Sequence, residues 1–550
     1  MHRSTIQTFA LGLLVLAPAL IAQPRSPQGI YAVVNIDEYT QAYDKIKSPT
    51  MSLEEYLVQQ YQGLLSNPAV SGLAIWVKWS LLNPNPPAKA GAYQWYWLDD
   101  VFNQVEAWNN ENPGKPPKTV QLVPTPGFNS PTWLLDEIYS CNFLFSFAYP
   151  APPLGTVCGK ATFSGFKEGG VVSGTPIARD LPMPWDPTYK RAWEIFLTAL
   201  NTRYGSNPWF VSISVAGPTA SSEEMILPAN QNTDASATQI GGLTVIQMWD
   251  KLLKYQYTGK PGYLRTDQAF IDEWENAINM YAGIFNSLTL VLTTGDGLPD
   301  LTTCDITSDT TCTFSMPLDP VTDFSQVCPV QNMDCAAEAT ILSYFDQGTV
   351  GGSNGKSTQT DGMKGSGSNA YNLGVPSVKL ISESTSIYSS IPSAEILGGS
   401  QFAKSFSNFP VEEGCTSVFP PPGYSDPNSV PVDLIPAACL NPSNTETLTE
   451  LGFTNFDQKT EAAYLISPEQ AEYNVLSWFF SGTVAGPAFG ASVGAAPLNH
   501  LQIYGPDITY ATKYATSKVP VIVGGSPVLY SAQDLLNMAN AALMQTTELP

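Results

Sequence analysis

The chain has 550 residues, and its 48 Asp and Glu against 25 Lys and Arg give a formal net charge of −23. A surface this acidic repels a phosphate backbone, which excludes a general nucleic-acid-binding protein. With only two histidines, His2 and His500, the chain also excludes a zinc site built from several imidazoles and leaves carboxylates as its main ionisable groups.

The first element in chain order is an expected secretory signal peptide over residues 1–22. A short basic start precedes the apolar stretch Phe9–Ala22, which is too short to span a bilayer and ends in small residues. The alternative interpretation is an N-terminal membrane anchor. The signal peptide predicts a secreted protein, extracellular or periplasmic, and no later stretch is long and apolar enough for a membrane span.

Apolar, β-branched runs alternate with amphipathic helical stretches along the rest of the chain. The predicted strands are Tyr31–Ile36, Gly72–Trp79, Thr119–Pro124, Phe210–Ala216, Leu288–Thr294, Gly348–Gly352, Val378–Glu383 and His500–Tyr504. The predicted helices are Leu53–Leu65, Trp97–Asn109, Thr188–Tyr204, Thr266–Phe285, Ala336–Phe345, Pro468–Phe480 and Ser531–Met544.

This alternation predicts an α/β fold. Near-continuous apolar strands are typical of a parallel sheet covered on both faces, and eight strand–helix units that close on themselves form a (β/α)8 TIM barrel. An open doubly wound sheet is the alternative, but no glycine-rich phosphate fingerprint follows the first strand. We expect residues 23–550 to form one elaborated barrel, because no linker separates a second domain.

Several strand-to-helix connections are long, and all eight cysteines fall in them. In a barrel these connections meet on the C-terminal face, where active sites are built. An even number of cysteines in an exported chain predicts disulfides, here between close neighbours. The expected pairs, which would pin the enlarged loops, are Cys141–Cys158, Cys304–Cys312, Cys328–Cys335 and Cys415–Cys439.

The segments around the second and third strands carry a resemblance to a known group of enzymes. Trp79, Leu82-Asn83-Pro84, Tyr93-Gln94-Trp95 and Leu98-Asp99 precede a strand followed by Gly127, Ser130-Pro131 and Trp133. This pattern resembles the early barrel of clan A glycoside hydrolases, over about a hundred residues closely and by strand order beyond them. The resemblance implies a TIM barrel with a retaining mechanism and does not identify one family.

In that clan the acid/base glutamate lies at the end of the fourth strand, which the resemblance places at Glu223 or Glu224. Glu224 is the preferred candidate, because Glu224-Met225 leads into an ordered segment whereas Glu223 is expected to face solvent. The chain departs from the clan pattern here, since the clan usually has Asn directly before the acid/base residue and this chain has Ser222 and Glu223.

The clan's nucleophile lies at the end of the seventh strand, which corresponds to Glu383. Apolar Val378, Leu380 and Ile381 lead directly to this residue. One alternative is that Glu383 is an ordinary loop carboxylate. Another is that Glu395 is the nucleophile. Two carboxyl groups suit glycoside hydrolysis, because one donates a proton to the leaving oxygen and the other attacks the anomeric carbon.

Aromatic residues near strand ends are candidate sugar platforms, since the C–H face of a pyranose stacks on aromatic rings. The candidates are Trp79, Trp185 and Tyr504, whereas Trp76 and Trp95 are expected to pack within the barrel. No cofactor and no metal site is expected: the acidic stretch after the fifth strand lacks a calcium-loop pattern.

The sequence therefore predicts a secreted glycoside hydrolase of carbohydrate metabolism that cleaves β-glycosidic bonds by a retaining mechanism with two glutamates. The expected partner is a neutral poly- or oligosaccharide substrate, and the expected state is a monomer. A glycan-binding barrel without catalysis, or a transglycosylase that uses the same two glutamates, are the alternatives.

Overall fold

The computed structural model describes residues 25–46, 51–166, 177–301 and 500–544 apart from short gaps, with four isolated residues between 302 and 499. Within these ranges the centre of the molecule is a sheet of six parallel strands. The strands are β1 (Gly29–Asn35), β2 (Val70–Lys78), β3 (Thr119–Thr125), β6 (Phe210–Ser214), β7 (Thr289–Val291) and β8 (His500–Tyr504).

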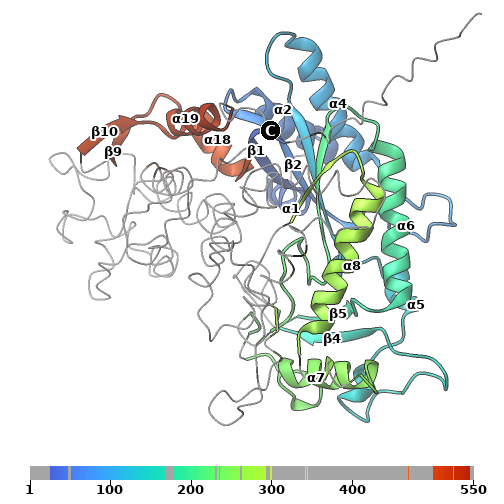
Figure 1. Cartoon of the computed structure of the whole chain (residues 1–550). Helices are drawn as coiled ribbons and strands as arrows, with labels where there is room; N and C mark the ends of the chain where they lie inside the picture. Colours follow the sequence, from blue (N-terminus) through green and yellow to red (C-terminus); the bar gives the residue numbers. More distant parts are fainter. Residues whose placement is uncertain are drawn as a thin grey trace, which may run out of the picture.

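The order of the strands in the sheet is β7-β6-β3-β2-β1-β8. Two neighbours in this order, β1 and β2, lie side by side in Figure 1. Strands that follow one another in the chain therefore lie side by side, and the last strand, β8, returns to pair with the first. These six strands match six of the predicted ones to within a few residues, so the predicted parallel α/β sheet is confirmed. The other two predicted strands, Gly348–Gly352 and Val378–Glu383, lie outside the described residues.

Helices follow most of the strands. They are α1 (Ile36–Ile46), α2 (Leu53–Ser66), α3 (Trp79–Leu82), α4 (Tyr96–Glu111), α5 (Thr132–Glu137), α6 (Pro187–Tyr204), α7 (Val245–Gln256), α8 (Gln268–Ile284), α18 (Gly505–Lys513) and α19 (Ala532–Met544). Five of them coincide with predicted helices, and α1, α3, α5, α7 and α18 are additional. The predicted helices Ala336–Phe345 and Pro468–Phe480 lie almost wholly outside the described residues.

Local sequence signals explain where several helices begin. Ser52 and Glu55 form a capping box at the start of α2, in which each side chain accepts a hydrogen bond from the backbone N–H of the other. Thr244 and Gln247 form the same arrangement at the start of α7. Asp186 accepts a hydrogen bond from the backbone N–H of Tyr189 (2.8 Å) and so caps α6.

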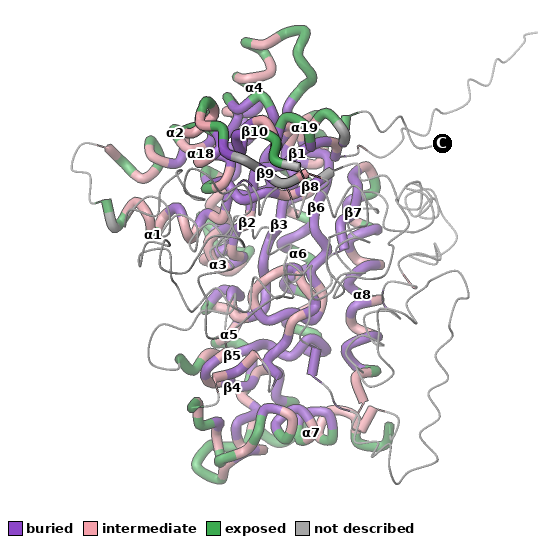
Figure 2. The backbone as a smooth tube through the Cα atoms, turned by 90° about the vertical axis from the view of Figure 1, so that its left-hand side faces the viewer, coloured by how far each residue is buried: buried purple, intermediate pink, exposed green. Residues whose placement is uncertain are grey.

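Alternate residues of each strand face opposite sides of the sheet. Ile30, Leu73 and Leu122 face the helices and belong to one large buried core. Tyr31 and Ala74 face the other side, where they form a smaller buried cluster. In Figure 2 the strands are coloured as buried along most of their length, as expected for a parallel sheet with cover on both faces.

The same second face also carries polar side chains near the middle of the sheet. Gln121 lies beside Ser212 in the register of β3 and β6, and its amide donates a hydrogen bond to Ser214 Oγ (3.1 Å). All three residues are fully buried. The face that would line the inside of a barrel is therefore partly polar.

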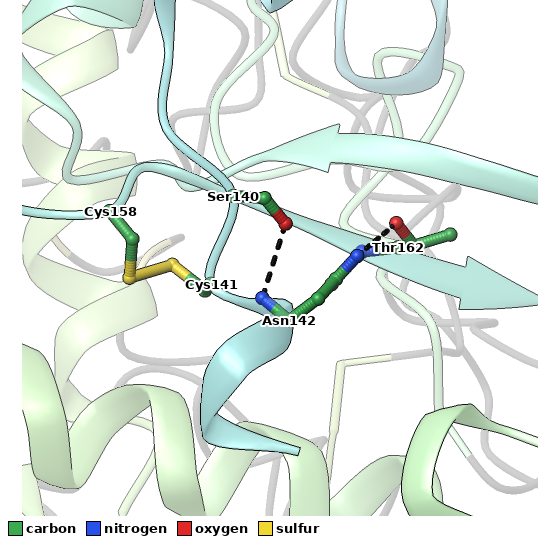
Figure 3. The surroundings of a disulfide bond; sticks show 5 residues. All are labelled: Ser140, Cys141, Asn142, Cys158 and Thr162. Carbon is green, nitrogen blue, oxygen red and sulfur yellow. Dashed lines mark hydrogen bonds between the residues drawn. A yellow bond between two sulfur atoms is a disulfide. The ribbon is translucent and has the colours of Figure 1, made fainter. Parts of the chain in front are cut away.

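Two antiparallel hairpins extend from this framework: β4 (Lys160–Ser164) with β5 (Ala178–Pro182), and β9 (Val519–Val523) with β10 (Ser526–Tyr530). Beside the first hairpin, Cys141 and Cys158 form a disulfide (Figure 3), which confirms the predicted pair. The three other predicted disulfides involve cysteines outside the described residues. Among the described helices, none is both long and apolar enough to cross a membrane.

Candidate active site

The candidate site lies in the loop that follows β6, the fourth strand of the sheet in chain order. Backbone hydrogen bonds fold residues 220–226 into a tight loop, because Ala220 N–H donates to Ile226 C=O (2.7 Å) and Ile226 N–H donates to Glu224 C=O (2.7 Å). Glu223 and Glu224 stand inside this closed loop. Their position beyond the carboxyl end of a parallel strand is where α/β folds build their active sites.

The end of β3 holds this loop in place. Gly127, Phe128 and Asn129 form a short 3-10 helix, η1, directly after the strand. Phe128 N–H donates to Ala220 C=O (2.5 Å), and Asn129 Nδ2 donates to Ser221 C=O (2.8 Å). The two glutamates are thus fixed against the neighbouring strand by a backbone bond and a side-chain bond.

Gly127 permits the close approach of these two segments. It has a φ of +67°, and a Cβ placed on it would lie 2.1 Å from Ala220 O and 2.4 Å from Thr219 O. Any other residue would have to push the loop away. The glycine and the asparagine that hold the loop both come from the segment whose pattern resembles clan A glycoside hydrolases.

Other residues of that pattern also contact one another. The indole N–H of Trp133 donates to Asn83 C=O (2.9 Å), and that of Trp79 donates to Asn83 Oδ1 (3.2 Å). Asn83 Nδ2 donates in turn to Ala92 C=O (2.9 Å). The pattern therefore corresponds to a connected structure at the carboxyl ends of β2 and β3.

Glu223 is almost completely buried, with 2% of its surface exposed. The expectation that it faces solvent is therefore wrong. Its Oε2 accepts no hydrogen bond from the described residues. Burial raises the pKa of this carboxyl group well above its usual value, and the neighbouring charge of Glu224 raises it further. Glu223 also acts on Tyr281 of α8, whose pKa is raised mainly by burial and further by nearby negative charge, including that of Glu223.

Glu224 lies in a different environment. It is only partly covered, and its Oε2 is 3.5 Å from the hydroxyl of Ser222, which can donate a hydrogen bond to it. The hydroxyl of Ser222 also accepts a hydrogen bond from the backbone N–H of Glu224 (3.2 Å). Burial of the carboxyl group raises the pKa of Glu224 to about 7, although the bond from Ser222 opposes this shift.

The pair therefore combines a buried carboxyl group with a partly accessible one. A carboxylic acid that keeps its proton near neutral pH can donate it to a leaving group, which is the requirement for general acid catalysis. Glu224 meets this requirement and is partly exposed. The other two candidates, Glu383 and Glu395, lie outside the described residues.

Two of the three expected sugar platforms prove to be core residues, which corrects the prediction. Trp79 is fully buried, and rings of Trp133, Tyr189, Trp193 and Phe196 surround it with centroids 4.8–6.5 Å away. Trp185 is 6% exposed and packs against three rings, with that of Phe270 stacked 6.1 Å away. Neither indole has a free face on which a sugar could stack.

Tyr504 lies at the carboxyl end of β8, on the side of the sheet that faces away from the helices. Its ring meets Trp76 edge to face, with centroids 6.2 Å apart. Tyr504 is 7% exposed and belongs to the smaller buried cluster. Its role as a sugar platform stays a proposal. His500 begins the same strand, at the opposite end from Tyr504.

Sequence reasoning missed two residues beside the glutamates. Asn129 holds the loop of Glu223 and Glu224, and Phe128 places its half-buried ring 4.6 Å from the guanidinium group of Arg179 in β5. Both stand in the segment Gly127–Trp133, whose spacing indicates the resemblance. The spacing identifies the residues that belong to the pattern, but it does not show which of them contact the loop after β6. Among the described residues no three potential metal ligands come together.

No family model matches the chain, and no curated protein matches it. Among the solved structures that match the chain in part are two β-galactosidases. Gan42B, a GH42 β-galactosidase, is 14% identical over 51% of this chain and 38% of its own, with a TM-score of 0.25. The β-galactosidase of Rahnella sp. R3 is 10% identical over 49% of this chain and 36% of its own, with a TM-score of 0.23.

This chain thus spans well under half the length of either β-galactosidase. Matches of this low identity and TM-score carry no argument about this chain. Its fold is defined by its own strand order, and its function has to be argued from the site. The class that fold and site define is an α/β protein whose parallel sheet carries two adjacent glutamates, one buried and one partly exposed, beyond its fourth strand.

Proposed function

We propose that the protein is a secreted glycoside hydrolase that cleaves β-glycosidic bonds of a neutral poly- or oligosaccharide by a retaining mechanism. Glu224 is the proton donor and Glu383 the nucleophile. The observation that carries this proposal is the Glu223–Glu224 loop, which stands at the carboxyl end of the fourth parallel strand and is held there by the end of β3.

The strand order supports a complete (β/α)8 barrel. The sheet has β7 at one edge and β8 at the other, and these are the fifth and eighth predicted strands. The sixth and seventh predicted strands fall between β7 and β8 in the chain, so their insertion would join the two edges. A closed barrel would place the carboxyl end of the seventh strand, with Glu383, across the mouth from Glu224.

The proposed reaction uses the two carboxyl groups in opposite protonation states. Glu224 gives its proton to the glycosidic oxygen while the carboxylate of Glu383 attacks the anomeric carbon, so that the leaving group departs and a glycosyl–enzyme ester forms. Glu224, now ionised, accepts a proton from water as the water attacks the ester. The released sugar keeps its anomeric configuration and Glu383 is regenerated.

The pKa of Glu224 fits the first step. At pH values below about 7 this carboxyl group carries the proton that the leaving group needs. An ionised Glu224 in turn raises the pKa of its buried neighbour Glu223, so the pair does not lose both protons together.

Incubation with a panel of neutral polysaccharides and synthetic β-glycosides tests the proposal by the release of reducing sugar. Glu224→Gln and Glu383→Gln should each abolish most of the release, on the order of a thousandfold, whereas Glu194→Gln on the exposed side of α6 should leave it unchanged. Proton NMR of the first product reports its anomeric configuration. Release that persists in both variants would exclude these residues, and binding without any release would favour a non-catalytic glycan-binding protein. Products longer than the substrate would indicate a transglycosylase.

A further inference from the structure

An exposed apolar segment follows β3, outside the candidate active site. We call residues 139–158 the apolar loop. Five of its large apolar side chains are exposed: Tyr139 47%, Phe147 106%, Tyr149 41%, Leu154 108% and Val157 52%. Complete exposure of a phenylalanine and a leucine in one short segment is unfavourable in water unless a partner covers them.

The two most exposed side chains are held out by ordered turns. Tyr149 N–H donates to Ser146 C=O (3.2 Å), which closes a turn with Phe147 at its second position. Thr156 N–H donates to Pro153 C=O (3.0 Å), which closes a second turn with Leu154 in the equivalent position. Gly155 supplies the positive φ, +86°, that the third position of this second turn adopts.

The base of the apolar loop is anchored firmly. The Cys141–Cys158 disulfide joins its two ends, and Asn142 exchanges hydrogen bonds with Thr162 of β4, donating to its hydroxyl (2.8 Å) and accepting from its N–H (3.0 Å) (Figure 3). Gly159 N–H donates to Tyr139 C=O (2.9 Å). Because the base is fixed, the exposed side chains are displayed without the entropy loss that ordering a free loop on binding would cost.

The hairpin under the apolar loop leads to the candidate site. β4 pairs with β5, and Arg179 of β5 lies over the ring of Phe128 in η1. Phe128 is bonded through its backbone N–H to the loop of Glu223 and Glu224. A continuous folded structure therefore connects the apolar loop with the site, and both lie on connections that leave the carboxyl ends of strands.

The charge distribution around the apolar loop favours an uncharged partner. No charged residue occurs between Glu137 and Lys160, although the chain as a whole has a net charge of −23. The segment thus offers apolar faces without fixed charge, while the rest of the molecule repels anionic surfaces, phosphate groups and a second copy of itself. A neutral polysaccharide meets no such repulsion, and its sugar rings present C–H faces that stack on tyrosine and phenylalanine.

We infer that the apolar loop is a docking surface for a neutral polysaccharide chain, and that the substrate of this protein is therefore a polymer. This inference rests on the proposed function for the class of ligand. The loop binds the polymer at a distance from the cleaved bond, whereas the carboxyl groups act on the bond itself.

The test is binding to insoluble cellulose, xylan, β-mannan and β-galactan, measured by depletion of the protein from solution. The variant is Phe147→Ser with Leu154→Ser, which changes only exposed side chains. The matched control is Leu529→Ser on β10, a leucine that is 59% exposed in a different hairpin. Phosphatidylcholine vesicles serve as a lipid probe in parallel.

The wild type and the control should bind at least one of the four polysaccharides, and the double variant should bind it about tenfold more weakly. Hydrolysis of a short synthetic glycoside should be equal in all three proteins. Absence of polysaccharide binding, equal binding by the double variant, or loop-dependent binding to the vesicles instead would each overturn the inference.

Binding is measured without turnover, so its result is separate from that of the proposed function. If binding depends on the apolar loop but no sugar is released, the proposed hydrolase function is refuted and the docking surface is supported. If sugar is released but polymer binding does not depend on the apolar loop, the docking surface is refuted and the hydrolase function is supported.

Discussion

The side-chain amide of Asn129 donates a hydrogen bond to the backbone carbonyl of Ser221 across a distance of 2.8 Å. The first residue follows β3 and the second follows β6, so this bond joins the carboxyl ends of two neighbouring strands. Asn129 is buried and also donates to the hydroxyl of Thr125 (3.1 Å). It fixes the start of the segment that carries Glu223 and Glu224.

Replacement of Asn129 by alanine should lower kcat much more than it changes KM for a short substrate. The carbonyl of Ser221 loses its partner and the glutamate loop moves, and small displacements of catalytic groups cost about a hundredfold in rate. The free energy of unfolding should fall by about 1–3 kcal/mol, because a buried acceptor is left unsatisfied. Steady-state kinetics and urea unfolding measure the two effects.

Asn109→Ala is the matched control for this prediction. Asn109 also makes two hydrogen bonds, to the backbone N–H and C=O of Lys118 (2.7 and 2.9 Å), but at the opposite end of β3. Its loss should destabilise the protein to a similar extent without changing kcat. If both variants lost activity in proportion to their stability, Asn129 would have no positioning role.

The fold could be predicted from the sequence wherever the spacing of apolar residues determines the secondary structure. The buried strands are continuous apolar runs, so β1, β2, β3, β6 and β8 are found at nearly the right residues. Helix α7 was missed although Thr244 and Gln247 form a capping box and Trp249, Leu252 and Leu253 face the core. Its signal was available, but the segment was interpreted only as a long connection.

The site could be predicted in position but not in orientation. Adjacent glutamates after the fourth strand mark the place, yet sequence does not show which of the two is buried. That depends on how the loop closes between Ala220 and Ile226 and on its position near Tyr281 of α8, which is distant in sequence. Trp79 illustrates the same limit, because a tryptophan at a strand end fits a sugar platform and a core ring equally well in sequence.

The pH dependence of activity follows from Glu224. This group must be protonated to act as the donor, and its pKa is raised to about 7, mainly by burial. The rate should therefore fall as the pH rises through about 7. Glu223→Gln should leave this limb of the pH–rate profile in place, because burial and not a charge on Glu223 raises the pKa of Glu224. A limb that moved to lower pH in Glu223→Gln would show that Glu223 is charged when Glu224 titrates.

Glu223 should also make the folded protein less stable as pH rises. Its pKa in the folded state lies well above the ordinary value, mainly because of burial, so the folded state binds more protons than the unfolded state once the pH exceeds about 4.5. The loss of folding stability begins at this pH and continues as the pH rises further. Unfolding free energies at about pH 5 and about pH 8 should differ less in Glu223→Gln than in the wild type, with Glu194→Gln as the unaffected control.

Lys118 should have the opposite dependence. Its amino group is buried below the ring of Trp108 and donates to the carbonyls of Asn67 (3.0 Å) and Val70 (2.6 Å). Burial lowers its pKa to about 7, so the unfolded state binds the extra proton between about pH 7 and its ordinary value of 10.5. The wild type should gain stability relative to Lys118→Met as pH rises through this window. A constant difference between the two proteins would mean that Lys118 stays charged throughout.

The disulfide between Cys141 and Cys158 should stabilise the folded protein mainly by restricting the unfolded chain. It closes a segment with a sequence separation of 17 residues, for which the loss on removal is about 3 kcal/mol. The double variant Cys141→Ala with Cys158→Ala should therefore unfold at lower urea concentration and bind polysaccharide more weakly, while short-substrate hydrolysis persists. Unchanged stability would show that the hydrogen bonds of Asn142 and Gly159 suffice to hold the base of the loop.

Gly127→Ala should directly move the loop that carries Glu223 and Glu224. Both Gly127 and Gly91 have a positive φ, +67° and +72°, so alanine at either position costs about 1–2 kcal/mol in backbone strain. Only at Gly127 would the new Cβ also collide with backbone oxygens, those of Thr219 and Ala220, whereas nothing lies within 4 Å at Gly91. Gly127→Ala should therefore lose about a hundredfold in kcat and a further 1–3 kcal/mol of stability, while Gly91→Ala should lose stability alone. Equal kcat in the two variants would show that the contact between η1 and residues 219–220 does not position Glu224.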